Sequence, residues 1–255
     1  MGLFSAGIVD YNGPMSRHFD AGRSLSPEAL AVWRTALQPH LAHADRVLDI
    51  GSGTGRFAVL LAEWFGLVVI GVEPAVGMRT AAAQAARCPG VFYVGGRAEQ
   101  LPVRAGLFGA ALLSNVFHHI QDREACTEEL RRVLAPGGRV LIRGAFAERL
   151  GEITLFDHFP EAKAICEQFP TLEETLDVFK GRGFALESVL PVVQQTCASL
   201  KELAARTRLR ADTTLALMAD EAFTARQAAL EEAAASERTP TPVVDTLDLI
   251  TLQQT

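Results

Sequence analysis

The sequence predicts an α/β protein built on a seven-stranded, mostly parallel sheet with helices on both faces. Short apolar runs typical of buried strands alternate with segments in which apolar residues recur at helical spacing, as expected for a parallel sheet covered on both sides. The chain has 255 residues, of which 49% are hydrophobic, and this is enough for one domain with a sizeable core and an added cap. A glycine-rich turn follows the first predicted strand.

Seven segments are expected to form the strands of the sheet. Each consists of, or begins with, an apolar run. The predicted strands are Val47–Ile50, Leu67–Val72, Val91–Val94, Phe108–Leu113, Arg139–Arg143, a strand that starts at Phe184, and Val243–Leu252.

The helices are predicted from capping residues and from apolar spacing. Ser26, Pro27 and Glu28 form a helix start, with a capping hydroxyl, a proline at the first helical position and an acid in the first turn. Further helices are expected at residues 54–65, 74–87, 122–134, 152–169, 171–181 and 200–232, the last followed by a proline-broken linker.

The chain is expected to form one compact domain with two parts. Residues 1–145 would contain an N-terminal lid and the ligand-binding core, and residues 146–255 the remainder of the sheet. A helical insertion at about residues 199–236 is expected to form a cap over a substrate pocket. A dimer interface would suit the same insertion.

Composition argues against several classes of function. The net charge of −6, the pI near 5.6 and the lack of a Lys/Arg cluster argue against a nucleic-acid partner. Four cysteines without a CxxC pair, no recognisable signal peptide and no apolar run of ~18 residues indicate a cytoplasmic protein without disulfides or a membrane span. His40 and His43 have the spacing of a metal pair, but no Cys or carboxylate cluster is near them, so no metal site is expected.

The segment VLDIGSGTGRFA, residues 47–58, places three glycines between a strand and a helix. The dinucleotide fingerprint fails because Arg56 stands where its third glycine belongs, and the P-loop fails because no Gly-Lys-Ser/Thr follows. Asp49 ends a buried strand, where a carboxylate needs a hydrogen bond or a cation. Glu73, about twenty residues later, is placed to accept the hydroxyls of a ribose. The turn is therefore expected to bind a ligand with a ribose and a positively charged part.

Five segments, in order, resemble the motifs of class I S-adenosylmethionine-dependent methyltransferases that act on small molecules. They are VLDIGSGTG, VIGVEPAVGM, GGRAEQLP, FGAALLSNVFHHIQD and LRRVLAPGGRVLI, within roughly residues 17–145. The resemblance implies a Rossmann-like fold, S-adenosylmethionine as cofactor and S-adenosylhomocysteine as its product. Gly109 departs from the pattern, because many relatives have an Asp there, and should affect packing rather than chemistry.

The resemblance also implies which residues hold the cofactor. Asp49 and the glycine turn would support the methionine part, Glu73 the ribose and residues 98–99 the adenine edge, while Arg23 would meet the carboxylate. The expected cofactor-binding residues are Arg23, Asp49, Gly51, Ser52, Gly53, Gly55, Glu73, Pro74, Met78, Ala98, Glu99 and Asn115.

Candidates for the acceptor side come from the N-terminal lid, the segment after the fourth strand and the segment after the fifth. His118 and His119 are candidates for a general base, because imidazole titrates near neutral pH. A structural or cofactor-lining role is the alternative for both histidines. The expected substrate-pocket residues are Tyr11, Phe19, Phe117, Asp157 and His158.

The expected reaction is an in-line displacement in which an O, N or C nucleophile of a small molecule attacks the sulfonium methyl group. The aliphatic insertion would suit a bulky, natural-product-like acceptor, and the protein is expected to be a monomer or homodimer. Two alternatives stay open. One is a methyltransferase-fold protein that binds the cofactor without methyl transfer, such as a regulator or a cyclase-like relative. The other is a nicotinamide-dependent oxidoreductase.

Overall fold

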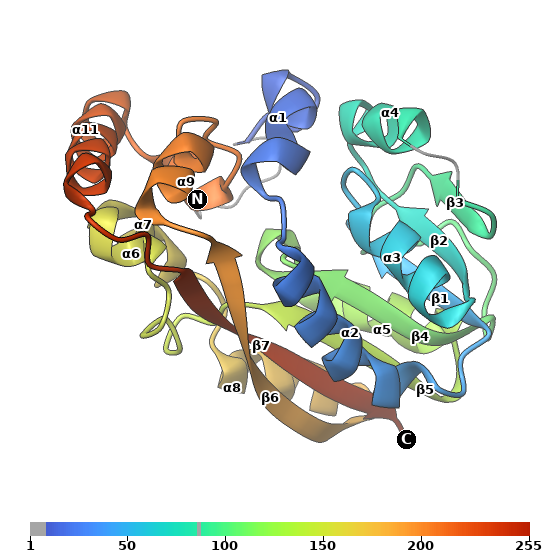
Figure 1. Cartoon of the computed structure of the whole chain (residues 1–255). Helices are drawn as coiled ribbons and strands as arrows, with labels where there is room; N and C mark the ends of the chain where they lie inside the picture. Colours follow the sequence, from blue (N-terminus) through green and yellow to red (C-terminus); the bar gives the residue numbers. More distant parts are fainter. Residues whose placement is uncertain (1–8, 86–87) are drawn as a thin grey trace.

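A seven-stranded sheet forms the centre of the protein in a computed structural model that describes residues 9–85 and 88–255 (Figure 1). The strand order is β3-β2-β1-β4-β5-β7-β6, and β7 runs antiparallel to both of its neighbours while the other pairs are parallel. The strands are β1 (Arg46–Ile50), β2 (Val68–Val72), β3 (Val91–Val94), β4 (Phe108–Ser114), β5 (Leu134–Gly144), β6 (Phe184–Cys197) and β7 (Val243–Gln254). The predicted α/β class and the seven-stranded, mostly parallel sheet are confirmed.

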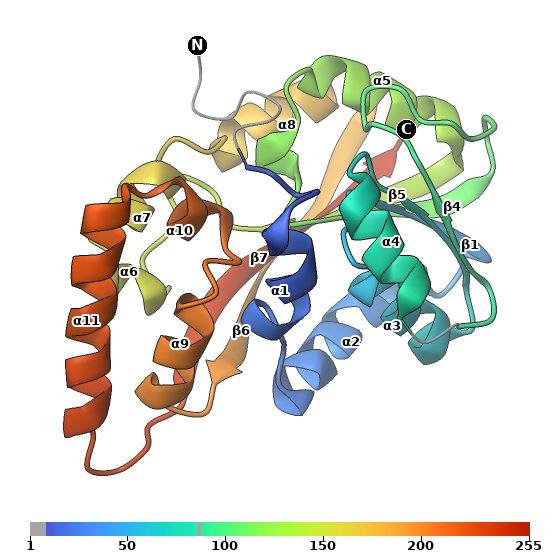
Figure 2. The same cartoon turned by 90° about the horizontal axis from the view of Figure 1, so that it is seen from above.

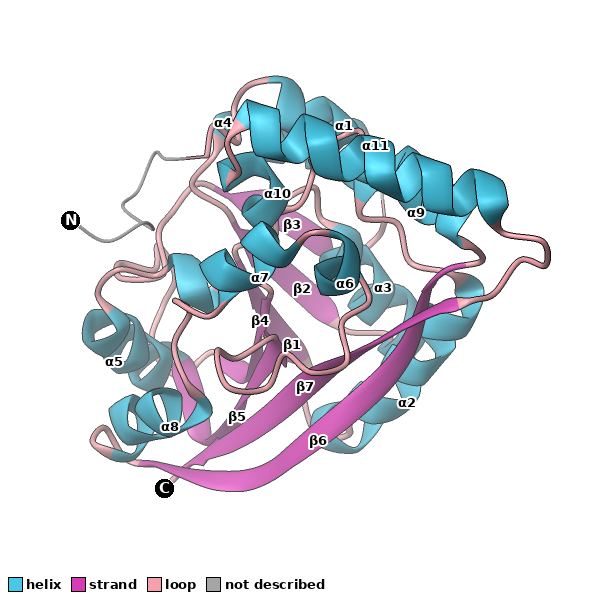
Figure 3. Cartoon of the chain, turned by 90° about the vertical axis from the view of Figure 1, so that its left-hand side faces the viewer, coloured by secondary structure: helices cyan, strands magenta, loops and turns pink. Residues whose placement is uncertain are grey.

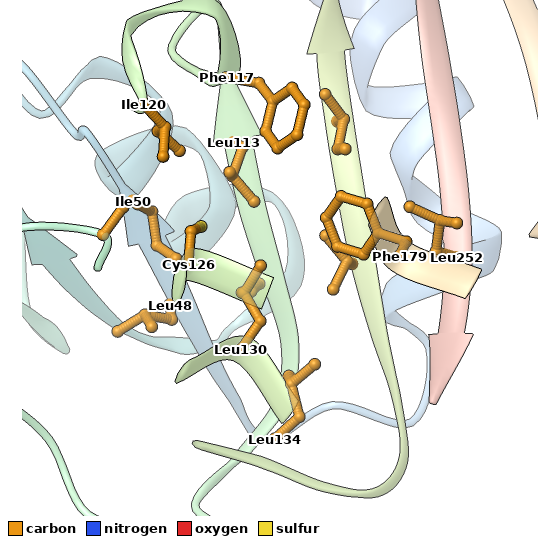
Figure 4. Packing of buried hydrophobic residues seen from close by; sticks show 14 of the residues in the cluster. Leu48, Ile50, Leu113, Phe117, Ile120, Cys126, Leu130, Leu134, Phe179 and Leu252 are labelled. Atoms are coloured by element: carbon orange, nitrogen blue, oxygen red, sulfur yellow. The ribbon is translucent and has the colours of Figure 1, made fainter. Parts of the chain in front are cut away.

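Helices pack on both faces of this sheet. Helices α2 (Pro27–Leu41) and α3 (Arg56–Phe65) share one apolar cluster with the central strands. Helices α5 (Arg123–Val133) and α8 (Leu172–Lys180) share another cluster on the opposite face. Figure 4 shows this second cluster, in which Leu48 and Leu113 of the sheet pack with Leu130 of α5 and Phe179 of α8. The strand side chains of this cluster come from short, mainly apolar runs, as expected for parallel strands whose two faces are both covered.

The start of α2 follows the predicted capping pattern. The Ser26 hydroxyl accepts a hydrogen bond from the Ala29 amide at 3.1 Å, Pro27 is the first helical residue and Glu28 lies in the first turn. Trp33 and Leu37 are fully buried against the sheet. A short local pattern therefore sets both where this helix begins and which of its faces is buried.

A separate group of helices stands beyond the sheet as a cap. It comprises α6 (Leu155–His158), α7 (Pro160–Cys166), α9 (Leu200–Thr207), α10 (Thr213–Leu217) and α11 (Asp220–Ser236). The cap has its own apolar core, in which the rings of Phe159 and Phe223 stack with centroids 5.9 Å apart. Figure 3 shows β6 and β7 as a long antiparallel pair that extends from the sheet to these helices.

An N-terminal helix, α1 (Pro14–Gly22), lies between the cap and the sheet. It contacts α9 of the cap and α4 (Val76–Gln84), which follows β2 (Figure 2). The sequence predicted a lid here without identifying the helix. The expected end of the helix after β2, at Arg87, lies outside the described residues.

Two long predicted helices are broken in the structure. The helix expected at 152–169 is divided at Phe159, because a residue that precedes a proline disfavours helical backbone, and Phe159 has φ −127° and ψ 72°. The helix expected at 200–232 is divided at Arg210, which has φ +45°, and again at Met218. The Arg210 guanidinium stabilises the chain between the two breaks by donating hydrogen bonds to the carbonyls of Leu215 and Met218.

The fifth strand also differs from its predicted bounds. β5 starts at Leu134, directly after α5, although Arg139 was expected as its first residue. The early residues pair irregularly with β4, where the register shifts between Phe108 and Ala110.

None of the helices within residues 9–85 and 88–255 has both the length and the apolar character needed to cross a membrane.

Candidate functional site

A cavity of about 700 Å³ opens where the parallel strands end. It is lined by residues 49–54 at the end of β1, by residues 72–75 at the end of β2, and by residues 114–116 at the end of β4. The opposite walls come from α1 and from the cap. Ligands of open α/β sheets bind at this carboxyl edge, and the volume suits a small-molecule site.

The glycine turn after β1 forms the floor of the cavity. Gly51, Gly53 and Gly55 have φ values of +64°, +55° and +84°, in the left-handed region that favours glycine. The amides of Gly51 and Ser52 both donate to the Val72 carbonyl, at 2.8 and 3.2 Å, so the turn is fastened to the end of β2.

The three glycines serve different purposes. A side chain at Gly51 would overlap Val116, and one at Gly55 would overlap the Tyr93 hydroxyl. A Cβ atom at Gly53 would meet only Phe19, at 3.9 Å. Gly51 and Gly53 line the cavity, whereas Gly55 does not. Gly55 therefore lies outside the cavity wall, and a glycine is required there by the left-handed backbone and by the packing of Tyr93.

Two buried carboxylates make one end of the cavity acidic. Glu73, which is 8% exposed, accepts hydrogen bonds from the Gly53 amide at 3.0 Å and from the Ala75 amide at 2.9 Å. Asp49 is 2% exposed, and its Oδ2 has no hydrogen-bond partner among the described residues. Burial, and then the nearby Glu73 charge, raises the pKa of Asp49 to about 8. Burial also raises the pKa of Glu73.

Two guanidinium groups, of Arg23 and Arg143, also line the cavity. The Asn115 side-chain amide is oriented with its oxygen towards both guanidinium groups. This oxygen accepts hydrogen bonds from Arg23 at 2.9 Å and from Arg143 at 2.7 Å. Asn115 follows β4 and has φ +53°, a left-handed conformation that asparagine tolerates. Arg23 also forms an ion pair with Asp212 of the cap. Burial lowers the pKa of Arg23.

Arg143 is a charged residue in an apolar setting. It is 3% exposed, and its guanidinium lies 4.3 Å from the Trp33 ring centroid and 5.2 Å from that of Phe57. Its further partners are the neutral oxygens of Ser114 at 3.3 Å and Gln194 at 3.1 Å. Burial, and then repulsion by Arg23 and Arg56, lowers the pKa of Arg143 to about 9.

Two adjacent histidines and a tyrosine line the cavity as well. His119 Nε2 lies 3.2 Å from the hydroxyls of both Tyr11 and Thr213, which are 2.8 Å from each other. The His118 ring stacks on Phe169 with centroids 4.0 Å apart. Burial, and then the Arg23 charge, lowers the pKa of His119 to about 4, and burial lowers the pKa of His118 strongly. Both rings are therefore neutral at physiological pH.

This geometry can be compared with proteins of known family. A family model described as "Methyltransferase domain" matches residues 48–142. A demethylmenaquinone methyltransferase of Thermus thermophilus is 37% identical over 167 residues, which cover 55% of this chain and 74% of that protein. The chain belongs to the class I S-adenosylmethionine-dependent methyltransferases. This membership separates it from the nicotinamide-dependent oxidoreductases.

Other methyltransferases match shorter segments or match by fold. An uncharacterised methyltransferase of Mycobacterium tuberculosis is 35% identical over 134 residues, 52% of this chain and 51% of that protein. The chain thus spans about half the length of such curated relatives. A solved structure from Anabaena variabilis, described as a methyltransferase from an antibiotic biosynthesis pathway, has a TM-score of 0.73 at 20% identity, with 90% of this chain and all of that chain covered.

The cavity has groups that fit S-adenosylmethionine, the cofactor of this methyltransferase family. The unpartnered Asp49 oxygen suits a cationic amino group, and the Ser52 hydroxyl, which also lacks a partner among the described residues, can bond a polar ligand. Gly53 leaves room for close approach of a ligand to the backbone. Glu73 has lone pairs left for hydroxyl groups after accepting two amides.

Most of the residues predicted for this methyltransferase site lie on the cavity wall, although they are far apart in the sequence. Those in the wall are Tyr11, Phe19, Arg23, Asp49, Gly51, Ser52, Gly53, Glu73, Pro74, Met78, Ala98, Glu99, Asn115, His118 and His119. Their individual roles stay predictions.

Three predicted substrate-pocket residues lie elsewhere. Phe117 is buried beneath the site, where its ring packs 5.8 Å from that of Phe179 (Figure 4). Asp157 and His158 are not in the wall, whereas Leu155 and Phe156 of the same short helix are. The prediction of Phe117, Asp157 and His158 as pocket residues is corrected accordingly.

Several wall residues were missed by sequence reasoning. Asp212 and Thr213 begin α10, and the Asp212 side chain caps that helix by accepting from the Thr214 amide at 2.9 Å. Their sequence indicates a helix start, but nothing local indicates contact with Arg23, 189 residues away. Arg143 and Gln194 lie in strands and carry no recognisable motif.

Proposed function

We propose that the protein transfers a methyl group from S-adenosylmethionine to an O, N or C atom of a small, largely apolar molecule. The observation that supports this most directly is one continuous cavity. Its acidic floor at the glycine turn suits the cofactor, and its wall on the side of the cap contains a group of apolar side chains. That wall includes Ile153, Leu155, Phe156, Phe169, Leu203, Leu215 and Leu217.

Each end of the cavity would have its own task. When bound, S-adenosylmethionine supplies a methyl group that its sulfonium charge already activates. The Glu73 carboxylate would hold the ribose hydroxyls, and Asp49 would be ionised by the nearby amino group. Arg23 would hold the carboxylate. Such fixed polar groups position the donor, so that the chain contributes mainly orientation and exclusion of water.

The cap would hold the acceptor against the donor. Its apolar side chains and the stacked His118 and Phe169 rings offer a surface for a flat or aliphatic molecule. His119, kept neutral by burial, has an Nε2 atom that can accept a proton or a hydrogen bond from the acceptor through the Tyr11 or Thr213 hydroxyl. A natural-product or quinone-like acceptor would match this wall, as the names of some relatives indicate for those proteins.

We further propose that the protein works in the cytoplasm as a monomer or homodimer. Its four cysteines are unpaired, and three of them are buried, which suits a reducing compartment.

The test combines binding with turnover. Calorimetry with S-adenosylhomocysteine should give micromolar affinity, and methyl-labelled S-adenosylmethionine should transfer label to members of a panel of quinols, phenols and aliphatic amines. Failure to bind either cofactor form would reject the proposal.

A second candidate is cofactor binding without methyl transfer. Burial favours it, because it lowers the pKa of both histidines and so makes each ring a weaker base. Tight binding of S-adenosylhomocysteine with no label transfer to any acceptor class would support this candidate.

A further inference from the structure

Two consecutive cap residues fasten the start of α10 across the cavity. Asp212 pairs with Arg23, which directly follows α1, and the Thr213 hydroxyl lies 2.8 Å from that of Tyr11 and 3.2 Å from His119 Nε2. Asp212 and Thr213 both line the cavity. Side-chain contacts therefore connect the cap to the N-terminal segment and to the sheet edge across the space available to ligands.

Arg23 is the cavity guanidinium best placed to bind an anion. Arg56 pairs with Asp20, and Arg97 pairs with its near neighbour Glu99. Arg206 pairs with Glu202 and donates to two backbone carbonyls. Arg143 donates to three neutral side chains within the sheet wall. Arg23 differs because it bridges two parts of the molecule: its carboxylate partner belongs to the cap, while its guanidinium also donates to Asn115 beside the glycine turn.

We propose that Asp212 competes with the carboxylate of the methyl donor for Arg23, so that donor binding releases the start of α10. The proposal rests on the proposed function, since it requires a donor with a carboxylate. Once the Arg23 guanidinium pairs with the donor carboxylate, its charge is balanced without Asp212. Two carboxylates at one guanidinium also repel each other. Donor binding would then loosen the wall that contains Leu215 and Leu217, and so open the acceptor half of the cavity.

The test is the substitution Asp212→Asn. Asparagine caps a helix as well as aspartate does, so α10 should keep its start while the competing charge is lost. Because the ion pair holds part of the molecules in a form that excludes the donor carboxylate, the variant should bind S-adenosylhomocysteine about 3- to 10-fold more tightly. Its affinity for 5′-methylthioadenosine, which has no carboxylate, should be unchanged.

The matched control is Asp220→Asn. Asp220 belongs to the same cap and pairs with Arg210, but it is exposed and lies outside the cavity wall. This variant should bind both ligands as the wild type does.

Hydrogen exchange of residues 211–218 gives an independent measurement. Exchange should rise when S-adenosylhomocysteine binds the wild type, and should already be high in Asp212→Asn without ligand.

Other outcomes overturn the proposal in distinct ways. Weaker binding of S-adenosylhomocysteine by Asp212→Asn, with 5′-methylthioadenosine unaffected, would mean that Asp212 orients Arg23 for the donor. Equal changes for both ligands, or slower exchange of residues 211–218 on binding, would also reject competition. If the wild type binds no S-adenosylhomocysteine, the proposed function itself fails, and this result is distinguishable from the others.

Discussion

The carboxylate of Glu73 accepts a hydrogen bond from the backbone amide of Gly53 at 3.0 Å, and this bond joins the end of β2 to the turn that follows β1. The other carboxylate oxygen accepts from the Ala75 amide at 2.9 Å. Glu73 thus organises the glycine turn in addition to facing the cavity. A ligand that uses its remaining lone pairs meets a carboxylate that two backbone amides already hold in position.

Replacement of Glu73 by Gln should weaken cofactor binding more than it weakens the fold. Glutamine keeps the shape and one oxygen acceptor, so one of the two backbone amides loses its partner. The loss of charge also weakens hydrogen bonds that a ribose would donate. We expect the affinity for S-adenosylhomocysteine to fall roughly 10- to 100-fold, in line with hydrogen bonds to charged groups. Calorimetry measures this. Glu63→Gln, on the exposed side of α3, is the control, and an equal loss in both variants would contradict the prediction.

Cofactor binding should release a proton from Asp49. Burial raises the pKa of this carboxyl to about 8, so it is protonated in the free protein at pH 6–7. A bound amino group favours the ionised form, and affinity should therefore rise as the pH increases from 6 towards 8. Calorimetry in two buffers of different ionisation enthalpy counts the released proton. Asp49→Asn should release none, and a wild type that releases none would disprove this assignment.

The same carboxyl should cost stability in the free protein at neutral pH. Its folded pKa lies above the unfolded value near 3.9, so the folded state holds the proton more tightly and loses stability as the pH rises from about 4 to 8. Asp49→Asn removes this loss. Its melting temperature should exceed that of the wild type at pH 8 by about 2–4 °C for each kcal/mol gained. At pH 4 the two proteins should melt at similar temperatures.

His119 should destabilise the protein below neutral pH. Its folded pKa of about 4 lies below the unfolded value near 6.5, so the unfolded state binds the proton first, and stability falls as the pH drops from 6.5 to 4. His119→Gln retains a hydrogen-bond acceptor for Tyr11 and Thr213 but cannot titrate. Urea unfolding at pH 5 and 7.5 should show a smaller pH effect in this variant. An unchanged difference would show that His119 is not the cause.

Alanine substitutions at Gly55 and at Gly66 should distinguish the energetic cost of backbone strain from that of side-chain crowding. Both have positive φ, +84° and +69°, but a side chain at Gly55 would overlap Tyr93, whereas one at Gly66 would have nothing within 4 Å. Gly66→Ala should cost about 1–2 kcal/mol of unfolding free energy from strain alone. Gly55→Ala should cost roughly 1–3 kcal/mol more, because the core is overpacked. Urea unfolding compares them, and equal losses would refute the role assigned to Tyr93.

Local patterns predicted much of the fold correctly. Neighbours only a few residues apart determine the helix start at Ser26, the strands that end at the glycine turn and at Glu73, and the turn itself. The structure contains these elements close to their predicted bounds. Helix bounds were less accurate in the cap. There the breaks at Phe159 and Arg210 depend on a proline and on hydrogen bonds to later carbonyls, which helical composition does not reveal.

The sequence by itself determined the fold class and the cofactor end of the cavity, because strand runs, turn glycines and capping residues act through backbone conformation over short distances. Tertiary structure alone decided that Tyr93 packs where a side chain at Gly55 would lie, that Phe117 belongs to the core, and that Asp212 pairs with Arg23. The last two groups are 189 residues apart in the chain. Such contacts depend on how the cap packs against the sheet, and that packing is set by the sum of many weak apolar contacts rather than by any local motif.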